Sequence, residues 1–200
     1  MRHRFGKLGA VASLALFAAI APTYPAHARE STSIEARAAS LEPGEYVWQP
    51  QNSTNGDVTI VISLQLQKAF VYRGDGLIGV STISSGKAGH ETPTGTFEIL
   101  QKRREHYSNL YDNAPMPFMQ RLTWSGVALH GGRIPGYPAS HGCIRLPNSF
   151  ARNLFGVTQL GATVHIVDRP ISEDEALAIA TNNLNDIRVG SAIELASGSN

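Results

Sequence analysis

Three β-strand patterns follow one another closely over residues 57–84, and they constrain the fold more than any other part of the chain. In residues 57–64, apolar residues alternate with Thr59, Val61 and Ser63, which predicts a strand with one strongly apolar face. Residues 68–73 and 77–84 predict two more strands. A hairpin turn is expected between them at Gly74-Asp75-Gly76, because glycine accepts the positive φ of tight turns. Three strands this close in sequence predict an antiparallel meander.

The rest of the chain adds more short strands and few helices. Phe150, Leu154 and Phe155 have helical spacing, and Ser172 followed by Glu175 is a capping-box pattern that predicts a second short helix. This composition predicts a mostly β domain, β-sandwich-like or barrel-like, with one or two short helices. The domain is expected to span residues 57–168. Its further strands are expected at 96–101, 116–124, 127–130 and 162–167, and a long polar loop at 102–115.

The N-terminus has the pattern of an export signal. Three cations among the first seven residues precede an uncharged apolar run over residues 8–20, and Ala26-His27-Ala28 fits a cleavage site. The run is shorter than the roughly 20 residues that a transmembrane helix needs. We therefore expect residues 1–28 to be cleaved, leaving no stable membrane span; an uncleaved anchor is the alternative.

The net charge of the part expected to be exported limits what that part can bind. Removal of residues 1–28 takes away three cations and no acid, so the net charge falls from +1 to −2. A chain with this balance has no broad basic field, which argues against nucleic-acid binding. Residues 29–56 have no sustained period and are expected to form a poorly ordered linker. Residues 169–200 are expected to form a C-terminal helix and tail.

Residues 129–147 concentrate the groups that can carry chemistry. They hold Cys143, which is the only cysteine, two of the seven histidines, four glycines and three prolines. An exported protein with one cysteine forms no internal disulfide. Most free cysteines are small buried hydrophobes, but Cys143 lies in a Gly/Pro-rich loop beside His141, Gly142 and Arg145. The pattern therefore favours a cysteine nucleophile in an acyl-transfer enzyme.

The neighbouring residues suit that chemistry. A thiol has a pKa of about 8.5, which falls beside an imidazolium or a helix N-terminus, and both are expected near Cys143. His130 and His141 both remain candidates for the base. A glycine at 142 lets backbone N–H groups face a developing oxyanion. Arg145 suits a substrate carboxylate, with a surface charge or an internal salt bridge as the alternative.

A zinc site is the competing interpretation of the same residues. Two histidines and a cysteine are zinc ligand types, but no fourth ligand clusters with them, and the His-Gly-Cys spacing is tight for one tetrahedral ion. We expect no metal and no organic cofactor.

Together these segments resemble a known family. His130, followed after a loop by Ser140-His141-Gly142-Cys143-Ile144-Arg145, resembles the active-site signature of the L,D-transpeptidase family with the YkuD-like catalytic domain. Gly86-Lys87, the run from Thr92 to Phe97, and Met116-Pro117-Phe118-Met119 are similar to other recurring segments of that family. The resemblance covers about residues 57–168. It implies a mostly β catalytic domain and an enzyme of the periplasm or cell envelope that acts on peptidoglycan stem peptides in cell-wall biogenesis and cell shape.

The resemblance also implies a role for each residue of the signature. Cys143 would attack the peptide bond before the terminal D-alanine of a tetrapeptide, with His130 as proton donor and acceptor. The acyl-enzyme would pass to an amine acceptor, another stem peptide or an envelope protein, and backbone N–H groups would form the oxyanion hole. The remaining residues of the signature would support the site: Gly131, Ser140, His141, Gly142 and Arg145.

The chain departs from the family's commoner pattern at three places. The connection between His130 and Ser140 is short, Gly131 stands where some members have serine or threonine, and Arg145 stands where others have asparagine. Without that hydroxyl, a backbone carbonyl is expected to orient the His130 ring. Two alternatives to a transpeptidase stay open: a carboxypeptidase in which water resolves the acyl-enzyme, and a non-catalytic wall-binding module.

Overall fold

The computed structural model describes residues 34–109 and 113–182, all of which belong to the unit formed by residues 31–200. The expected signal peptide at 1–28 and the chain after residue 182 lie outside the described residues. Among the residues described, no helix has the length and apolar character needed to cross a membrane. The elements are α1 (Ile34–Ala39), β1 (Tyr46–Trp48), a 3-10 helix η1 (Pro50–Asn52), β2 (Val58–Ser63), β3 (Lys68–Arg73), β4 (Gly76–Thr82), β5 (Gly95–Glu98), β6 (Gln101–Arg103), β7 (Met119–Arg121), β8 (Ala128–Gly131), β9 (Ile144–Leu146), α2 (Asn148–Val157), β10 (Thr163–Val167) and α3 (Glu173–Ala180).

Six strands form the larger sheet, in the order β1-β4-β3-β2-β10-β5. β2, β3 and β4 pair as the antiparallel meander that the sequence predicts, with Ile60 opposite Val71 and Phe70 opposite Val80. β10 pairs with β2 in parallel and with β5 antiparallel. The mostly β fold class is confirmed, but the parallel pairing of β2 with β10 was not expected.

Four strands form the smaller sheet, in the order β6-β7-β8-β9. β7 and β8 make the expected hairpin, with Gln120 opposite Leu129. β9 lies in a stretch whose composition predicted only a loop. It pairs in parallel with β8, with His130 opposite Arg145. This pairing sets the position of the nucleophile loop, because Cys143 is the residue before β9.

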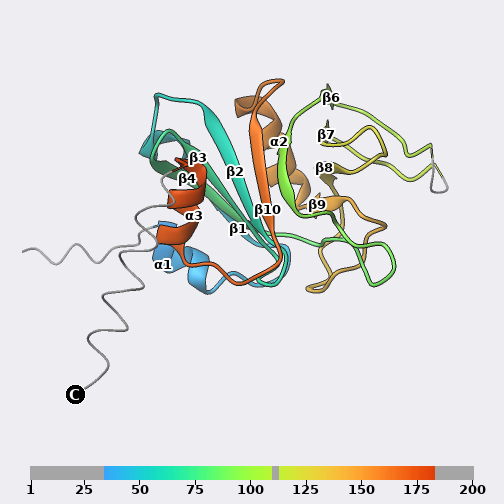
Figure 1. Ribbon diagram of the computed structural model, residues 1–200, viewed down its shortest axis with the longest axis horizontal. Coiled ribbons are helices and arrows are strands. Elements are labelled where there is room, and N and C mark those ends of the chain that lie inside the picture. The colour runs from blue at the N-terminus through green and yellow to red at the C-terminus, as the bar shows by residue number, and fades with distance from the viewer. Residues whose placement is uncertain (1–33, 110–112, 183–200) are drawn as a thin grey trace, which may run out of the picture. The chain divides into compact units, whose positions relative to one another are not determined.

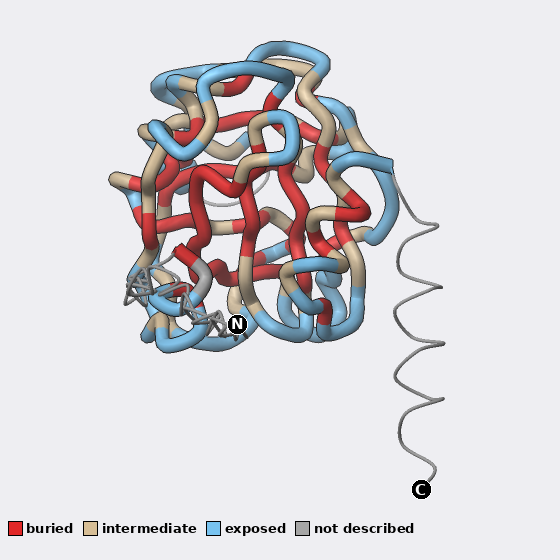
Figure 2. The backbone as a smooth tube through the Cα atoms, turned by 90° about the vertical axis from the view of Figure 1, so that its left-hand side faces the viewer, coloured by how far each residue is buried: buried red, intermediate tan, exposed pale blue. Residues whose placement is uncertain are grey.

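The larger sheet is covered on both faces. One face packs against α2 and the smaller sheet around the fully buried Phe150, whereas α1 and α3 cover the other face (Figure 1). Val61 points into this second core, so β2 has two buried faces where the sequence predicted one. Figure 2 shows the result, with buried strand interiors and exposed connections at their ends.

The segment expected to be a poorly ordered linker is structured from residue 34 onward. Ile34 and Ala38 of α1 are buried in the second core, and β1 pairs antiparallel with β4. The short helix offers little apolar sequence of its own, and its order comes from the sheet face that it covers. The expectation of disorder over 29–56 was therefore wrong for residues 34–56.

The expected loop at 102–115 is also largely ordered. Strand β6 begins it, and residues 104–109 and 113–118 then form two facing segments, which we call the hairpin arm. Phe118 N–H donates to the Arg104 carbonyl, and Met116 N–H donates to the His106 carbonyl. A bridge between Tyr107 and Pro115 continues the pairing. The polar composition of the arm has no strand pattern, so the sequence did not predict this backbone pairing.

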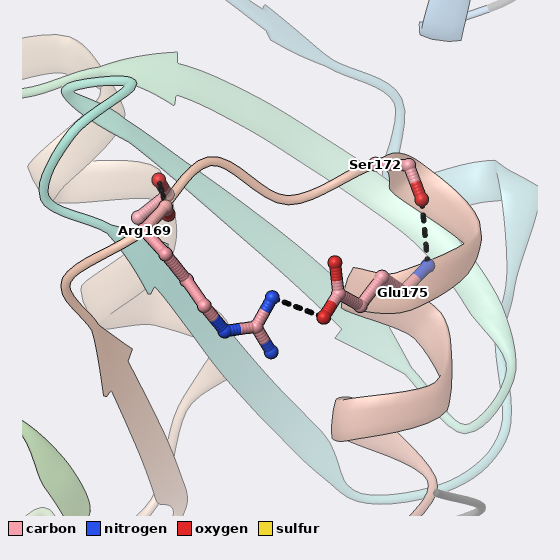
Figure 3. Close-up of polar contacts among 4 residues, drawn as sticks. Arg169, Ser172 and Glu175 are labelled. Atoms are coloured by element: carbon pink, nitrogen blue, oxygen red, sulfur yellow. Dashed lines mark hydrogen bonds and ion pairs between the residues drawn. The ribbon is translucent and has the colours of Figure 1, made fainter. Parts of the chain in front are cut away.

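The predicted helix start at Ser172 is confirmed, with one difference. Ser172 Oγ accepts a hydrogen bond from Glu175 N–H at 3.2 Å, as an N-cap should (Figure 3). In a complete capping box the glutamate would return to the backbone of the serine. Here the Glu175 carboxylate pairs with Arg169 instead, which ties the chain before α3 to its first turn.

Lys102 closes the C-terminal end of α2. Its Nζ donates to the carbonyls of Phe155 at 2.8 Å and Thr158 at 2.6 Å, and lies 4.3 Å from the centroid of the Phe155 ring. Because the last carbonyls of a helix lack partners, Lys102→Met is expected to lower the free energy of unfolding by about 1–2 kcal/mol. Chemical denaturation measures this change. Lys87→Met, at an exposed turn, is the matched control; equal stability of the two variants would contradict the assignment.

Candidate active site

A cavity of about 330 Å³ opens over the smaller sheet, and it contains both residues at the centre of the sequence prediction. This volume lies at the lower end of the range of about 300–1,000 Å³ typical of ligand pockets. His130 on β8 and Cys143 before β9 both line it. The remaining lining comes from the β7–β8 turn, the hairpin arm and the nucleophile loop: Ser108, Ala114, Pro115, Met116, Ser125, Gly126, Val127, Gly132, Arg133, Ser140, His141 and Arg145.

Ser140 holds the loop that carries Cys143. Its Oγ accepts from Gly142 N–H at 3.1 Å and donates to the Cys143 carbonyl at 2.5 Å. Only 1% of Ser140 is exposed, so water does not compete for these bonds. Gly142 has a φ of +109°, a conformation that residues with a side chain rarely adopt. The serine and the glycine of the signature therefore have structural roles here.

The segment after β4 forms hydrogen bonds with the backbone on both sides of this loop, and no sequence pattern predicted this support. Ser84 exchanges two backbone hydrogen bonds with Arg145, and the Ser85 carbonyl accepts from the N–H groups of Ala139 and Ser140. Gln67 in turn holds Ser85, since its side chain donates to Ser85 Oγ and accepts from Ser85 N–H. No local pattern marks Gln67 as part of a site, because its effect is exerted through a segment 18 residues later in the chain.

The His130 ring is held in one tautomer. Its Nδ1 lies 2.9 Å from the Gly131 carbonyl, and since a carbonyl can only accept, Nδ1 carries the proton and Nε2 is left as the acceptor. This is the backbone carbonyl that the sequence analysis expected. Asn148 of α2 occupies the space that a β-carbon at Gly131 would need, so a serine or threonine at this position would require the Asn148 side chain to move.

Burial keeps His130 uncharged. It lowers the pKa of His130 to about 4; the positive charges of Arg145 and His106 act in the same direction, and the hydrogen bond to Gly131 opposes them. At neutral pH the imidazole is therefore a neutral base.

The Cys143 thiol differs from the expectation of a lowered pKa. Burial raises the pKa of Cys143 above its ordinary value, and the Ala128 backbone and the charges of Arg145 and Arg121 offset this only in part. The sulfur packs against Met116, Met119 and Ala128. The helix that was expected to lower the pKa begins at Asn148, with β9 and Pro147 between it and Cys143. The free site therefore holds a neutral thiol and a neutral imidazole.

The other candidate residues lie around the same cavity in different environments. Arg145 is half-buried opposite His130, and its aliphatic carbons lie against Gly132. His141 is exposed, and its ring packs edge-to-face with that of His90, 4.7 Å between centroids. Within residues 34–109 and 113–182, no group of three or more His, Cys, Asp or Glu is placed to hold a metal ion.

The family model of the L,D-transpeptidase catalytic domain, also called YkuD, matches residues 57–166. The chain belongs to this family. A curated relative, the Bacillus subtilis protein YqjB, which is named as a candidate L,D-transpeptidase, is 28% identical over 142 residues, and the match covers 62% of this chain and 80% of YqjB.

Solved L,D-transpeptidase structures share the fold. The enzyme from Stackebrandtia nassauensis is 26% identical with a TM-score of 0.54, covering 68% of this chain and 66% of the other. LdtMt1, solved in complex with imipenem, is 25% identical with a TM-score of 0.51, covering 55% and 58%. The enzyme from Mycobacterium smegmatis is 23% identical with a TM-score of 0.52, covering 56% and 58%, and shows the fold alone. The chain thus spans 58–66% of the length of these solved chains.

Proposed function

We propose that this L,D-transpeptidase family member cross-links or modifies peptidoglycan by acyl transfer through Cys143. The observation that carries the proposal is the cavity shared by the only cysteine and a neutral histidine whose Nδ1 is already occupied. The donor is a tetrapeptide stem, and the bond attacked is the L,D-peptide bond before its terminal D-alanine. Residues 1–28 would export the protein to the periplasm or cell envelope, where this substrate is found.

The reaction begins from the neutral pair. His130 Nε2 takes the thiol proton as Cys143 Sγ forms a bond to the donor carbonyl carbon. The tetrahedral intermediate collapses with cleavage of the C–N bond, and the D-alanine amine leaves with the proton held by His130. In the second half, an acceptor amine attacks the thioester, His130 takes its proton, and the cysteine leaves and is reprotonated.

The oxyanion needs a backbone donor, and the hydrogen bonds around Cys143 indicate which one. Gly142 N–H is already bonded to Ser140 Oγ and is not free to serve. Within the described part of the chain, the Cys143 N–H makes no hydrogen bond. The sequence left open which backbone N–H groups would form the oxyanion hole, and we assign this role to the Cys143 N–H.

Arg145 is proposed to bind a carboxylate of the donor. Among the residues that the structure describes, those lining the cavity include Arg145 and Arg133 but no acidic residue. Arg145 forms no ion pair with any residue that the structure describes. This arrangement fits the free carboxylate at the end of a stem peptide, since a guanidinium and a carboxylate pair with two parallel hydrogen bonds.

Arg145→Gln is expected to raise the KM for the tetrapeptide by about tenfold to a hundredfold, the equivalent of about 1.5–3 kcal/mol for a charged hydrogen bond. Steady-state release of D-alanine measures it, and Arg152→Gln, exposed on α2, is the matched control. A donor whose terminal carboxyl is amidated should bind the wild type and Arg145→Gln equally. If Arg145→Gln weakens the amidated donor as much as the free acid, Arg145 does not bind that carboxylate.

Intact-protein mass spectrometry tests the proposed function directly. After incubation with a disaccharide-tetrapeptide, the protein should gain the mass of the donor less D-alanine. Added stem peptide should then yield a cross-linked dimer, whereas a carboxypeptidase would yield only a tripeptide. A folded protein that forms no adduct and turns over no donor would support the wall-binding module instead. Imipenem, which is bound in the LdtMt1 structure, provides a second acylating probe.

A further inference from the structure

Two buried hydroxyl groups fix the backbone around the nucleophile. Ser140 Oγ bonds the Gly142 N–H on one side and the Cys143 carbonyl on the other. The peptide unit between them is held by Thr92, whose Oγ1 donates to the Gly142 carbonyl at 2.9 Å. Thr92 is only 4% exposed and lies 50 residues before Gly142 in the chain. The three successive peptide units at Gly142 and Cys143 are thus each anchored at one end.

The middle peptide unit is the one that matters for acyl transfer. The Gly142 carbonyl and the Cys143 N–H belong to the same peptide bond, and no peptide bond among the described residues is cis. In a trans peptide the C=O and N–H vectors point in opposite directions. Holding the carbonyl toward Thr92 therefore turns the Cys143 N–H away from it. We take this direction as the one toward the substrate, because Cys143 lines the cavity and Thr92 does not.

Thr92 also strengthens that donor through its own partner. The Gly86 N–H donates to Thr92 Oγ1 at 2.9 Å, and the Thr92 hydroxyl then donates to the Gly142 carbonyl. Hydrogen bonds in such a chain polarise one another in the same direction. Gly86 has no room for a side chain, since a β-carbon there would collide with the His90 carbonyl. This series of hydrogen bonds therefore depends on the close approach of residues 86 and 92.

We infer that Thr92 is a positioning residue that aims and polarises the Cys143 N–H as the oxyanion donor. The inference rests on the proposed acyl transfer and assigns a function to the Thr-Pro-Thr-Gly turn, which the mechanism otherwise leaves unused. It separates two properties of the site. Thr92 acts on the stabilisation of the tetrahedral oxyanion and has no part in the reactivity of the sulfur itself.

Two reactions of the same thiol distinguish these properties. Acylation by the disaccharide-tetrapeptide or by imipenem passes through an oxyanion, whereas alkylation by iodoacetamide does not. Thr92→Val removes the hydroxyl at nearly constant shape. We expect it to slow both acylations by about tenfold to a hundredfold, somewhat less than the loss of an oxyanion donor itself. Alkylation, measured at one alkaline pH, should stay within about twofold of the wild-type rate, and Thr92→Ser should restore acylation.

Thr158→Val is the matched control. Thr158 is a buried threonine whose hydroxyl also has two partners, Gln120 and Leu154, but it lies at the end of α2, outside the cavity. The Thr158→Val substitution should lower the melting temperature without changing the ratio of the acylation rate to the alkylation rate. Wild-type acylation rates in Thr92→Val would overturn the inference. So would an equal loss of acylation and alkylation, which would mean that Thr92 merely holds the sulfur in place.

The wild-type reactions separate this inference from the proposed function. If the wild type reacts with imipenem but not with the tetrapeptide, the donor assignment fails, and the comparison of Thr92 variants with imipenem still decides the inference. If iodoacetamide alkylates the wild type while neither acylating probe reacts, the acyl-transfer function and the role of Thr92 fail together.

Discussion

Cys143→Ala is expected to abolish the covalent adduct with the tetrapeptide and with imipenem, and to reduce D-alanine release by about 10⁴-fold or more. The reason is that no other thiol exists in the chain and that Cys143 lines the same cavity as His130. Intact mass spectrometry after incubation with each probe measures the adduct. A variant that still gained the donor mass would show that another residue is acylated.

The fold should survive this substitution. The Cys143 side chain is only partly buried, and the hydrogen bond from its sulfur to the Gly126 carbonyl is long, at 3.5 Å. The free energy of unfolding is therefore expected to change by no more than about 1 kcal/mol. A cooperative melt close to that of the wild type makes the loss of adduct a chemical effect; a collapsed melt would instead make Cys143 a structural residue.

His130→Ala is expected to lower kcat/KM for D-alanine release by about 10²–10⁴-fold, the usual contribution of general acid–base catalysis. The effect should be large because burial raises the thiol pKa, so little thiolate exists without a base to take its proton. His165→Ala, on β10 outside the cavity, is the matched control. If His141→Ala abolishes activity while His130→Ala retains it, the base is His141.

The pH dependence of the wild type provides a second measure of His130. With a pKa of about 4, the base stays unprotonated in weakly acidic buffer, so the acidic limb of kcat/KM should fall near pH 4 and not near 6.5. The folded-state pKa lies below the unfolded value, so the unfolded chain binds more protons in that window. Stability from this residue is complete above pH 6.5 and is lost as the pH falls toward 4, by roughly 3 kcal/mol in all. His130→Ala should flatten this part of the pH-stability curve; an unchanged curve would contradict the assignment.

The sequence predicted the elements that have local signals. The β2–β4 meander follows from alternation and a glycine turn, and the start of α3 follows from Ser172. β9 could not be predicted, because three residues are too few to show a period and its partner lies 15 residues earlier. The order of α1 could not be predicted either, since it comes from the apolar sheet face beneath it.

For the candidate site too, the sequence predicted some residues and properties and not others. His130 and Cys143 were marked by residue type and by their motif, and the cavity brings them together. Their pKa values were not predictable, since burial and the intervening β9 depend on the tertiary fold. Gln67 and Thr92 were missed as supports because each acts through hydrogen bonds to backbone far along the chain.

The placement of α1 and α3 has a consequence for access to a polymer. Both helices pack on the face of the larger sheet turned away from the smaller sheet (Figure 1). The cavity is lined from the side of the smaller sheet, so the described chain enters and leaves the domain on the side remote from it. The proposed donor belongs to a peptidoglycan strand, which is far longer than the enzyme and would pass across the cavity mouth. With both connections on the other face, a tether or an added domain at either end would leave that path open.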